Sequence, residues 1–307
     1  MSGKKRAFTL VEILVSILIL GIVMSAVLTI FYSVFESYQF HQDINEAKQR
    51  GQIALAALQP YVINAGLGLP NEINTFQDKA FKGQNKIIPV PGNLADPKNF
   101  RLPVQLAKSI TEIETDNTKT EAPALWLVYS VPSGAGINSF PETGDLIIDV
   151  GSFAALDATN NLKTDLADLR SWLAFPASMS PFTVGNIDVS NKQLKLNETV
   201  SRNLSLFDEI HFIRAVKIYV NNNSLWVESL LTNQSQSLIE GIAGMWVSYD
   251  RDGDKVLKIS VLARGDTRHN KQYQTEYEGW PADAPLPPAA DRNFRYAVVS
   301  RSWRIRN

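Results

Sequence analysis

Apolar side chains occupy the first part of the chain almost without interruption. From Ile13 to Phe35 the sequence runs for 23 positions without a charged residue. At about 1.5 Å per residue, a helix over this run is roughly 35 Å long, which exceeds the ~30 Å hydrocarbon core of a bilayer. The pattern therefore predicts a helix that spans a membrane.

The helical pattern continues beyond this run but becomes amphipathic. Apolar residues recur every three or four positions, at Phe40, Ile44, Ala47, Ile53, Ala54, Ala57 and Leu58. Polar residues take the other positions, at Asp43, Glu46, Lys48, Gln49 and Arg50. We expect one helix from about Phe8 to Asn64. Pro60 favours a bend or an early end, because proline cannot donate a backbone hydrogen bond to the helix.

Strand patterns dominate the rest of the chain. Apolar runs between turn-forming residues predict strands at 124–130, 145–150, 209–220, 225–231, 242–249, 255–263 and 294–305, and a strand pair within 182–196. Proline-containing segments at 71–121 and 265–292 predict loops, the first with a short strand near 86–90, and residues 164–173 favour a short helix. The expected fold class is α+β, with a long N-terminal helix and an antiparallel β-sheet.

Charged residues flank the apolar run on its N-terminal side. The basic stretch Lys4 to Arg6 precedes Ala7 and Phe8, and Glu12 is then the only charged residue before Glu36. An ionised group next to hydrocarbon costs about 2.5 to 3.5 kcal/mol, so an acid in this position needs a partner or a function. The basic stretch favours the cytoplasmic side of a membrane, which places the remainder of the chain on the opposite side.

These residues resemble the type III signal of type IV prepilins and pseudopilins. The resemblance implies that a membrane-bound prepilin peptidase cuts between Ala7 and Phe8 and that the new amine of Phe8 is methylated. Glu12 would then set the register of assembly by pairing with the amine of a neighbouring subunit. The alternative is an ordinary membrane anchor with an acid at its cytosolic edge.

Later segments are similar to the large minor pilins of the PilW type and to the J-type minor pseudopilin of type II secretion. They are GQIALAALQPYVINAGLG, GIAGMWVSYDRDGD with VLKISVLARG, and the ending WRIRN. This resemblance implies a leader at 1–7, a transmembrane half-helix at 8–35, an amphipathic half-helix at 36–65 and a β-rich periplasmic or extracellular domain at 66–307. It also implies a single-pass protein of the bacterial inner membrane that later reaches the pilus or cell surface.

Three functions fit this resemblance. The first is a minor pilin in a priming or tip complex of a type IV pilus, with other minor and major pilins and an inner-membrane assembly platform as partners. The second is a minor pseudopilin of a type II secretion system, and the third is a tip-located adhesion module. Genomic neighbourhood would separate the first two, and a binding assay would test the third.

Composition and motifs restrict the partners, metal sites and catalytic functions that we expect. Loss of Lys4, Lys5 and Arg6 would change the net charge from −1 to −4, so no nucleic-acid partner is expected. The chain has no cysteine, and its three histidines show no paired metal-ligand spacing, which favours surface or interface imidazoles. We find no nucleophile elbow and no phosphate-binding loop, and we therefore expect no enzyme.

One acidic loop offers oxygen ligands for a metal. Asp250, Asp252 and Asp254 alternate around Gly253, an arrangement that can direct several oxygens at calcium. The loop lacks the full length and closing glutamate of an EF-hand. Since Asp and Gly also favour tight turns, a metal-free hairpin turn is the alternative to calcium.

The six tryptophans raise the alternative of a carbohydrate-binding platform. Most lie in strand-like runs, where core packing is the better interpretation. Trp280, in a proline-rich segment, is expected to be an exposed contact residue.

Overall fold

The long helix forms as the sequence predicts. The computed structural model describes residues 9–67, 104–112, 119–153, 173–175, 179–182, 184–197, 199–200, 203–206, 208–229, 234–250, 253–270, 272, 277–284 and 291–305. Helix α1 covers Leu10–Ile63, 54 residues, and continues through Pro60. Pro60 lies on the exposed side, where water can bond to the backbone carbonyl that it leaves without a donor. The helix ends at Asn64, and Gly66 follows with a φ of 83° that suits glycine.

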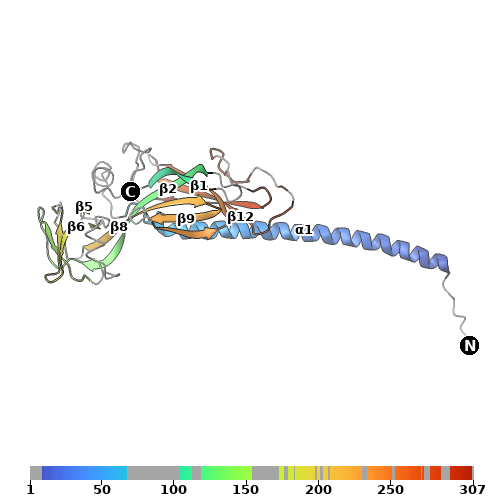
Figure 1. The fold of residues 1–307 in the computed structure, drawn as a ribbon, viewed down its shortest axis with the longest axis horizontal. Helices are drawn as coiled ribbons and strands as arrows, with labels where there is room; N and C mark the ends of the chain where they lie inside the picture. The colour runs from blue at the N-terminus through green and yellow to red at the C-terminus, as the bar shows by residue number, and fades with distance from the viewer. Residues whose placement is uncertain are drawn as a thin grey trace, which may run out of the picture.

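Antiparallel strands form the rest of the fold (Figure 1). Within the described ranges, the largest sheet has seven strands: β1 (Val104–Glu112), β2 (Lys119–Gly136), β4 (Leu173–Phe175), β5 (Met179–Phe182), β8 (Glu209–Asn221), β9 (Ser224–Ser229) and β10 (Ser235–Glu240). Its long central strand β8 pairs with β2 along one edge. Along the other edge, β8 pairs with β4 near its beginning and with β9 near its end, so the sheet divides there.

A second sheet contains β11 (Ile242–Asp250), β12 (Val256–Arg264) and β13 (Tyr296–Arg304), in that order. The predicted hairpins are confirmed here and at β8–β9, where Asn222 and Asn223 both have positive φ. Asparagine tolerates this conformation, which matches the right-handed twist of the strands that the turn joins. The last predicted strand corresponds to β13, which pairs with β12.

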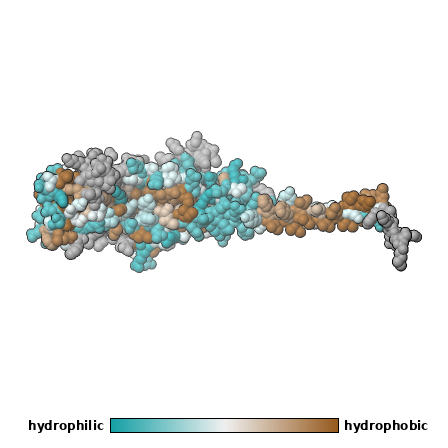
Figure 2. Space-filling model, turned by 90° about the horizontal axis from the view of Figure 1, so that it is seen from below, coloured by the Kyte–Doolittle hydropathy of each residue, from teal (hydrophilic) through white to brown (hydrophobic). Residues whose placement is uncertain are grey.

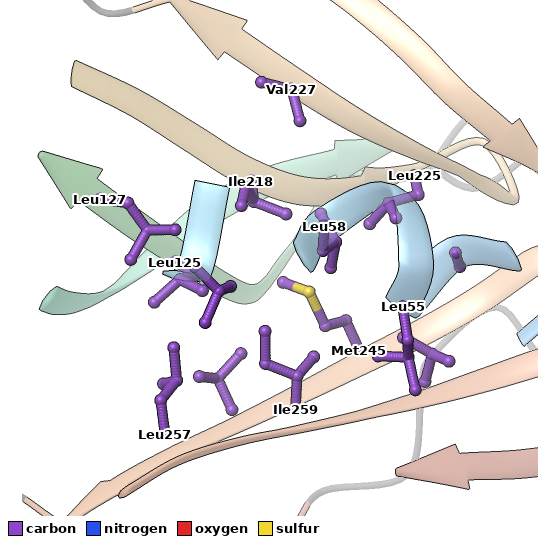
Figure 3. Close-up of a cluster of buried hydrophobic side chains, with 14 of the residues drawn as sticks. Leu55, Leu58, Leu125, Leu127, Ile218, Leu225, Val227, Met245, Leu257 and Ile259 are labelled. Atoms are coloured by element: carbon purple, nitrogen blue, oxygen red, sulfur yellow. The ribbon is translucent and has the colours of Figure 1, made fainter. Parts of the chain in front are cut away.

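The main core lies where α1 meets these two sheets (Figure 3). Leu55 and Leu58 of the helix pack between Leu125, Ile218 and Leu225 of the first sheet and Met245 and Ile259 of the second, and all of these side chains are buried. Burial of each aliphatic side chain of this size contributes about 1.5 to 3 kcal/mol. The second half of α1 is therefore an integral part of the domain.

A third, small sheet lies at the end of the molecule farthest from the N-terminus (Figure 1). It contains β3 (Ile147–Asp149), β7 (Gln193–Leu196) and β6 (Val184–Asp188), in that order. Ile148 and Leu194 of this sheet share a second core with Phe175 and Ile210 of the first sheet. The two cores follow one another along the molecule, with β8 running through both.

Some sequence predictions do not match the structure. The predicted loop 71–121 contains the whole of β1 and the beginning of β2, and no strand was predicted at β10. The final residue of the predicted helix 164–173, Leu173, begins strand β4, while the rest of that segment and the strand predicted near 86–90 lie outside the described residues. Strands β1 and β10 mix polar and apolar residues and pair with β2 and β9.

Gly51 allows α1 to approach β13 closely, which generates a stability prediction. A Cβ at this position would lie 2.6 Å from Val299 Cγ2, well inside van der Waals contact. Gly51→Val should therefore lower the free energy of unfolding by about 1 to 3 kcal/mol through overpacking. Urea unfolding of the full chain in detergent micelles, followed by tryptophan fluorescence, measures the change.

The matched control is Gln52→Val, which introduces the same side chain at the neighbouring, exposed position. Surface substitutions of this kind change stability by no more than about 0.5 kcal/mol. Equal losses in the two variants would contradict a specific contact between Gly51 and β13.

Candidate functional site: the projecting helix

The first half of α1 projects from the domain and is apolar all round (Figure 2). Among the described residues, one helix is long and apolar enough to cross a membrane, and the most apolar window of that helix is wholly exposed in the structure. The same length and composition occur in core helices of soluble proteins, but a core helix is buried within its own chain. The apolar half of α1 therefore needs an apolar environment that this chain does not provide.

Glu12 begins the helix in a capping box with Thr9. The carboxylate Oε2 of Glu12 accepts from the Thr9 backbone N–H at 2.9 Å and from Thr9 Oγ1 at 3.0 Å, while Glu12 N donates to Thr9 Oγ1 at 3.4 Å. This arrangement satisfies backbone donors that have no partner within the helix. The acid thus has a local role in the monomer, in addition to the assembly role that the resemblance implies.

Ala7 and Phe8, the residues of the predicted cleavage and methylation, lie outside the described residues. The structure places Thr9 and Glu12 directly after them, at the first turn of α1. Cleavage at the predicted bond would leave the amine of Phe8 one residue before the amide that Glu12 already binds. The pairing of Glu12 with the amine of a neighbouring subunit stays a prediction.

A polar cluster marks the point where α1 enters the domain. Asp43 is 3% exposed, and its Oδ2 lies 2.5 Å from His269 Nε2 and 3.7 Å from Arg295 Nε. The Arg295 guanidinium also stacks over the ring of Phe40, 4.3 Å from its centroid. Asp43 occupies a polar position of the amphipathic pattern, yet it is buried, because His269 covers it from 226 positions away in the sequence.

A second contact lies two turns farther along the same face. Arg50 Nη1 donates to the Arg264 carbonyl at 3.1 Å, and its Nη2 forms an ion pair with Asp266. The connection from β12 to β13 carries Asp266 and His269, so both contacts tie this connection to the helix. We use the name helix junction for Asp43, Arg50, Asp266, His269 and Arg295. It fixes the helix at the level where the projecting half begins.

The other histidines have structural positions. His211 Nδ1 lies 3.0 Å from Ser130 Oγ, and burial lowers the pKa of the His211 imidazole despite the opposing charge of Glu209. A Ser–His pair can belong to a nucleophilic site, but Ser130 is only 1% exposed and sits within β2, where a substrate has no access. His41 is exposed on the helix. Surface or interface positions for these imidazoles agree with the sequence interpretation.

The acidic loop between β11 and β12 contains the predicted calcium ligands. Asp250 Oδ1 accepts from the Gly253 backbone N–H at 3.1 Å, the hydrogen bond of a tight turn, while Asp252 lies outside the described residues. Within the part of the chain that the structure describes, no three acidic or histidine side chains form a metal cluster. Calcium binding by Asp250, Asp252 and Asp254 remains a prediction from the sequence.

The tryptophans mostly contribute to packing. Trp126 and Trp303 are buried and Trp226 and Trp246 are half-buried, as a core role predicts, while Trp172 lies outside the described residues. The prediction of an exposed Trp280 was wrong, because this residue is half-buried in a turn in which its backbone N–H donates to the Tyr277 carbonyl.

Comparison with known families identifies the N-terminal segment. Residues 2–28 match the family model described as the prokaryotic N-terminal methylation motif. This is the type IV pilin-like signal. Neither a curated protein nor a solved structure matches the chain.

The match explains the features of the projecting helix together. The type IV pilin-like signal indicates a type IV pilin- or pseudopilin-like protein, processed by prepilin peptidase and assembled with other pilins. Its apolar helix, close to the N-terminus, suggests that the protein is anchored in a membrane. The pilin-motif family is structural rather than catalytic, in keeping with the absence of enzyme motifs from the sequence.

The helix junction of this pilin-like protein generates the second prediction. Asp43→Ala should lower the free energy of unfolding by about 3 kcal/mol, because it leaves His269 and Arg295 facing a buried site without their carboxylate. The measurement is urea unfolding of the full chain in detergent micelles. Asp43→Asn, which retains a hydrogen-bond acceptor, should lower the free energy of unfolding by a smaller amount.

Asp266→Ala is the matched control at the same junction. The side chain of Asp266 is 67% exposed, and an exposed ion pair contributes no more than about 1 kcal/mol. If Asp43→Ala and Asp266→Ala lower the free energy of unfolding equally, the buried carboxylate is not the main contact between the helix and the β12–β13 connection.

Proposed function

We propose that this protein is a minor pilin that takes part in type IV pilus assembly, in a priming or tip complex. The observation that carries the proposal is the complete exposure of the apolar half of α1, which begins with the type IV pilin-like signal. A membrane covers such a helix before assembly, and the helices of neighbouring subunits cover it afterwards. During assembly, the apolar surface of the helix therefore moves from the lipid to the helices of neighbouring subunits.

The minor role is supported by the domain that follows the helix. The chain has 307 residues, about twice the length usual for a main shaft subunit, and its later segments are similar to PilW-type minor pilins. A minor pseudopilin of a type II secretion system carries the same signal and is the alternative. The residues of the N-terminal signal do not distinguish a minor pilin from a minor pseudopilin, because both are processed and assembled through the same helix.

The proposed organisation follows from the helix. Residues 1–7 are the leader, 8–35 cross the inner membrane, 36–65 pack on the domain and 66–307 form a β-rich periplasmic domain. The partners are prepilin peptidase, other minor and major pilins and the inner-membrane assembly platform. Lys4, Lys5 and Arg6 support this orientation, because positive residues remain on the cytoplasmic side.

Glu12 is proposed to set the register of assembly. Its carboxylate already accepts two hydrogen bonds from Thr9, a cap worth about 0.5 to 2 kcal/mol. A buried amine of Phe8 without a counter-charge costs more, about 3 to 5 kcal/mol. Pairing Glu12 with that amine in a neighbouring subunit is therefore favourable even if part of the capping box is lost.

Mass spectrometry of purified filaments tests the proposal. Pili sheared from the producing bacterium should contain this chain at low copy, with methylated Phe8 as its first residue. An unmethylated chain that begins at Met1, found in the membrane and never in pili or with pilins, would contradict the proposed function.

Substitution of Glu12 tests the register role separately. Glu12→Leu removes the cost of about 2.5 to 3.5 kcal/mol for an acid near hydrocarbon, so membrane insertion should become easier. Assembly should nevertheless fall severalfold, because the amine of Phe8 loses its counter-charge. The measurement is the amount of chain in sheared pili relative to the amount in membranes.

Glu36→Leu is the control, since it removes the next acid along α1 and lies beyond the uncharged run. It should be incorporated normally. Normal incorporation of Glu12→Leu would refute the register role and leave Glu12 as a recognition feature for processing.

A further inference from the structure

A cavity of about 400 Å³ opens on the small sheet. Figure 1 shows this sheet at the end of the molecule opposite the projecting helix. Strand β3, the segment before it and strand β7 form its walls, which include Phe140, Asp145, Leu146, Ile147, Asp149 and Gln193. This volume lies within the usual range of ligand-binding pockets. We call this cavity the distal pocket.

Exposed apolar side chains surround the distal pocket. Phe140 is 68% exposed, Ile147 49% and Leu146 40%. Single exposed apolar residues are common on protein surfaces, but three around one cavity form a patch of the kind that binds a partner. Phe140 is the most exposed of the three.

Two carboxylates are held in place beside this patch. Asp145 Oδ2 accepts from the Glu142 backbone N–H at 2.8 Å, and Asp149 Oδ1 accepts from Gln193 Nε2 at 2.9 Å. A carboxylate has about four acceptor positions, so each group retains capacity for a further donor. The described walls of the pocket contain no basic side chain that would neutralise these charges.

The segments around the distal pocket also carry more acidic than basic residues. Residues 137–153, 184–197 and 208–210 include six acidic residues and two basic ones, Lys192 and Lys195. Lys195 pairs with Ile147 across β3 and β7 but is not part of the pocket wall. The acidic field favours a cationic partner, and the apolar rim favours one that also carries an apolar side chain.

The geometry points to a docking site for a protein segment in which an apolar side chain stands beside lysine or arginine. The apolar side chain enters the pocket against Phe140 and Ile147, and the cation pairs with Asp145 and Asp149. Because α1 anchors the opposite end of the molecule, the partner binds at the membrane-distal end. This site goes beyond the proposed role in assembly, since it does not involve α1.

The test uses the full chain in phosphatidylcholine nanodiscs and a fluorescent peptide, Lys-Leu-Lys with blocked ends. Fluorescence anisotropy measures binding, with empty nanodiscs as the background. Lys-Leu-Lys should bind at least about fivefold more tightly than either control peptide. Glu-Leu-Glu lacks the positive charges that pair with the carboxylates, and Lys-Ser-Lys lacks the apolar side chain that enters the pocket. Its affinity should also fall as salt is added.

Substitutions identify the surface. Phe140→Ser and Asp145→Asn should each weaken binding severalfold, and asparagine at 145 retains an oxygen for the Glu142 N–H. Asp188→Asn is the matched control, because Asp188 lies on the same small sheet, outside the pocket wall, with a carboxylate that accepts from Ser190 and Asn191. It should leave binding unchanged, and urea unfolding confirms that each variant is folded.

Three results would overturn the proposal. They are equal binding of the acidic and basic peptides, unchanged binding by Phe140→Ser and Asp145→Asn, and displacement of the peptide by methyl glucoside, which would indicate a carbohydrate site instead. None of these results bears on assembly through α1, so the two proposals fail independently.

Discussion

The need to cover the apolar surface of α1 is the constraint on which the rest of the structure depends. Its second half is covered by the protein itself, with Leu55 and Leu58 packed between two sheets. Its first half exposes apolar side chains on every side, and nothing in the described chain packs on it. A soluble protein could not tolerate this surface, since each exposed aliphatic side chain forfeits about 1.5 to 3 kcal/mol of burial. The covering must come from lipid or from other subunits, as the type IV pilin-like signal indicates.

The helix junction lies at the boundary between these two environments. Asp43 is the first buried residue of α1, and its partners His269 and Arg295 lie at the two ends of the connection between β12 and β13. Apolar packing fixes the depth of the helix, and the buried carboxylate of Asp43 adds a directional constraint, because it meets the His269 imidazole and the Arg295 guanidinium only in this position. Close packing at Gly51, the residue after Arg50, adds a steric limit. Together they hold the projecting half at a defined direction relative to the domain.

Three parts of the structure therefore follow one another along the length of the molecule. An apolar helix lies at one end, a core shared by the helix and two sheets follows, and a small sheet with the distal pocket lies at the other end (Figure 1). Strand β8 connects the last two parts, because it contributes Ile218 to one core and Ile210 to the other. The residues proposed for assembly and those proposed for recognition therefore lie at opposite ends of the molecule.

The sequence alone determined the elements whose signals are local. The approximate bounds of α1 and the β8–β9 and β11–β12 hairpins follow from periodicity and turn chemistry over a few neighbouring residues, whereas the capping box of Thr9 and Glu12 was not predicted. Tertiary structure decided the rest. Strands β1 and β10 are completed by pairing with β2 and β9. Asp43 is buried because His269 reaches it from 226 positions away, and Gln193 meets Asp149 only because β3 and β7 are neighbours. A helix or a hairpin forms its own hydrogen bonds within a short window, whereas an ion pair or a pocket depends on where distant segments meet, which no local pattern specifies.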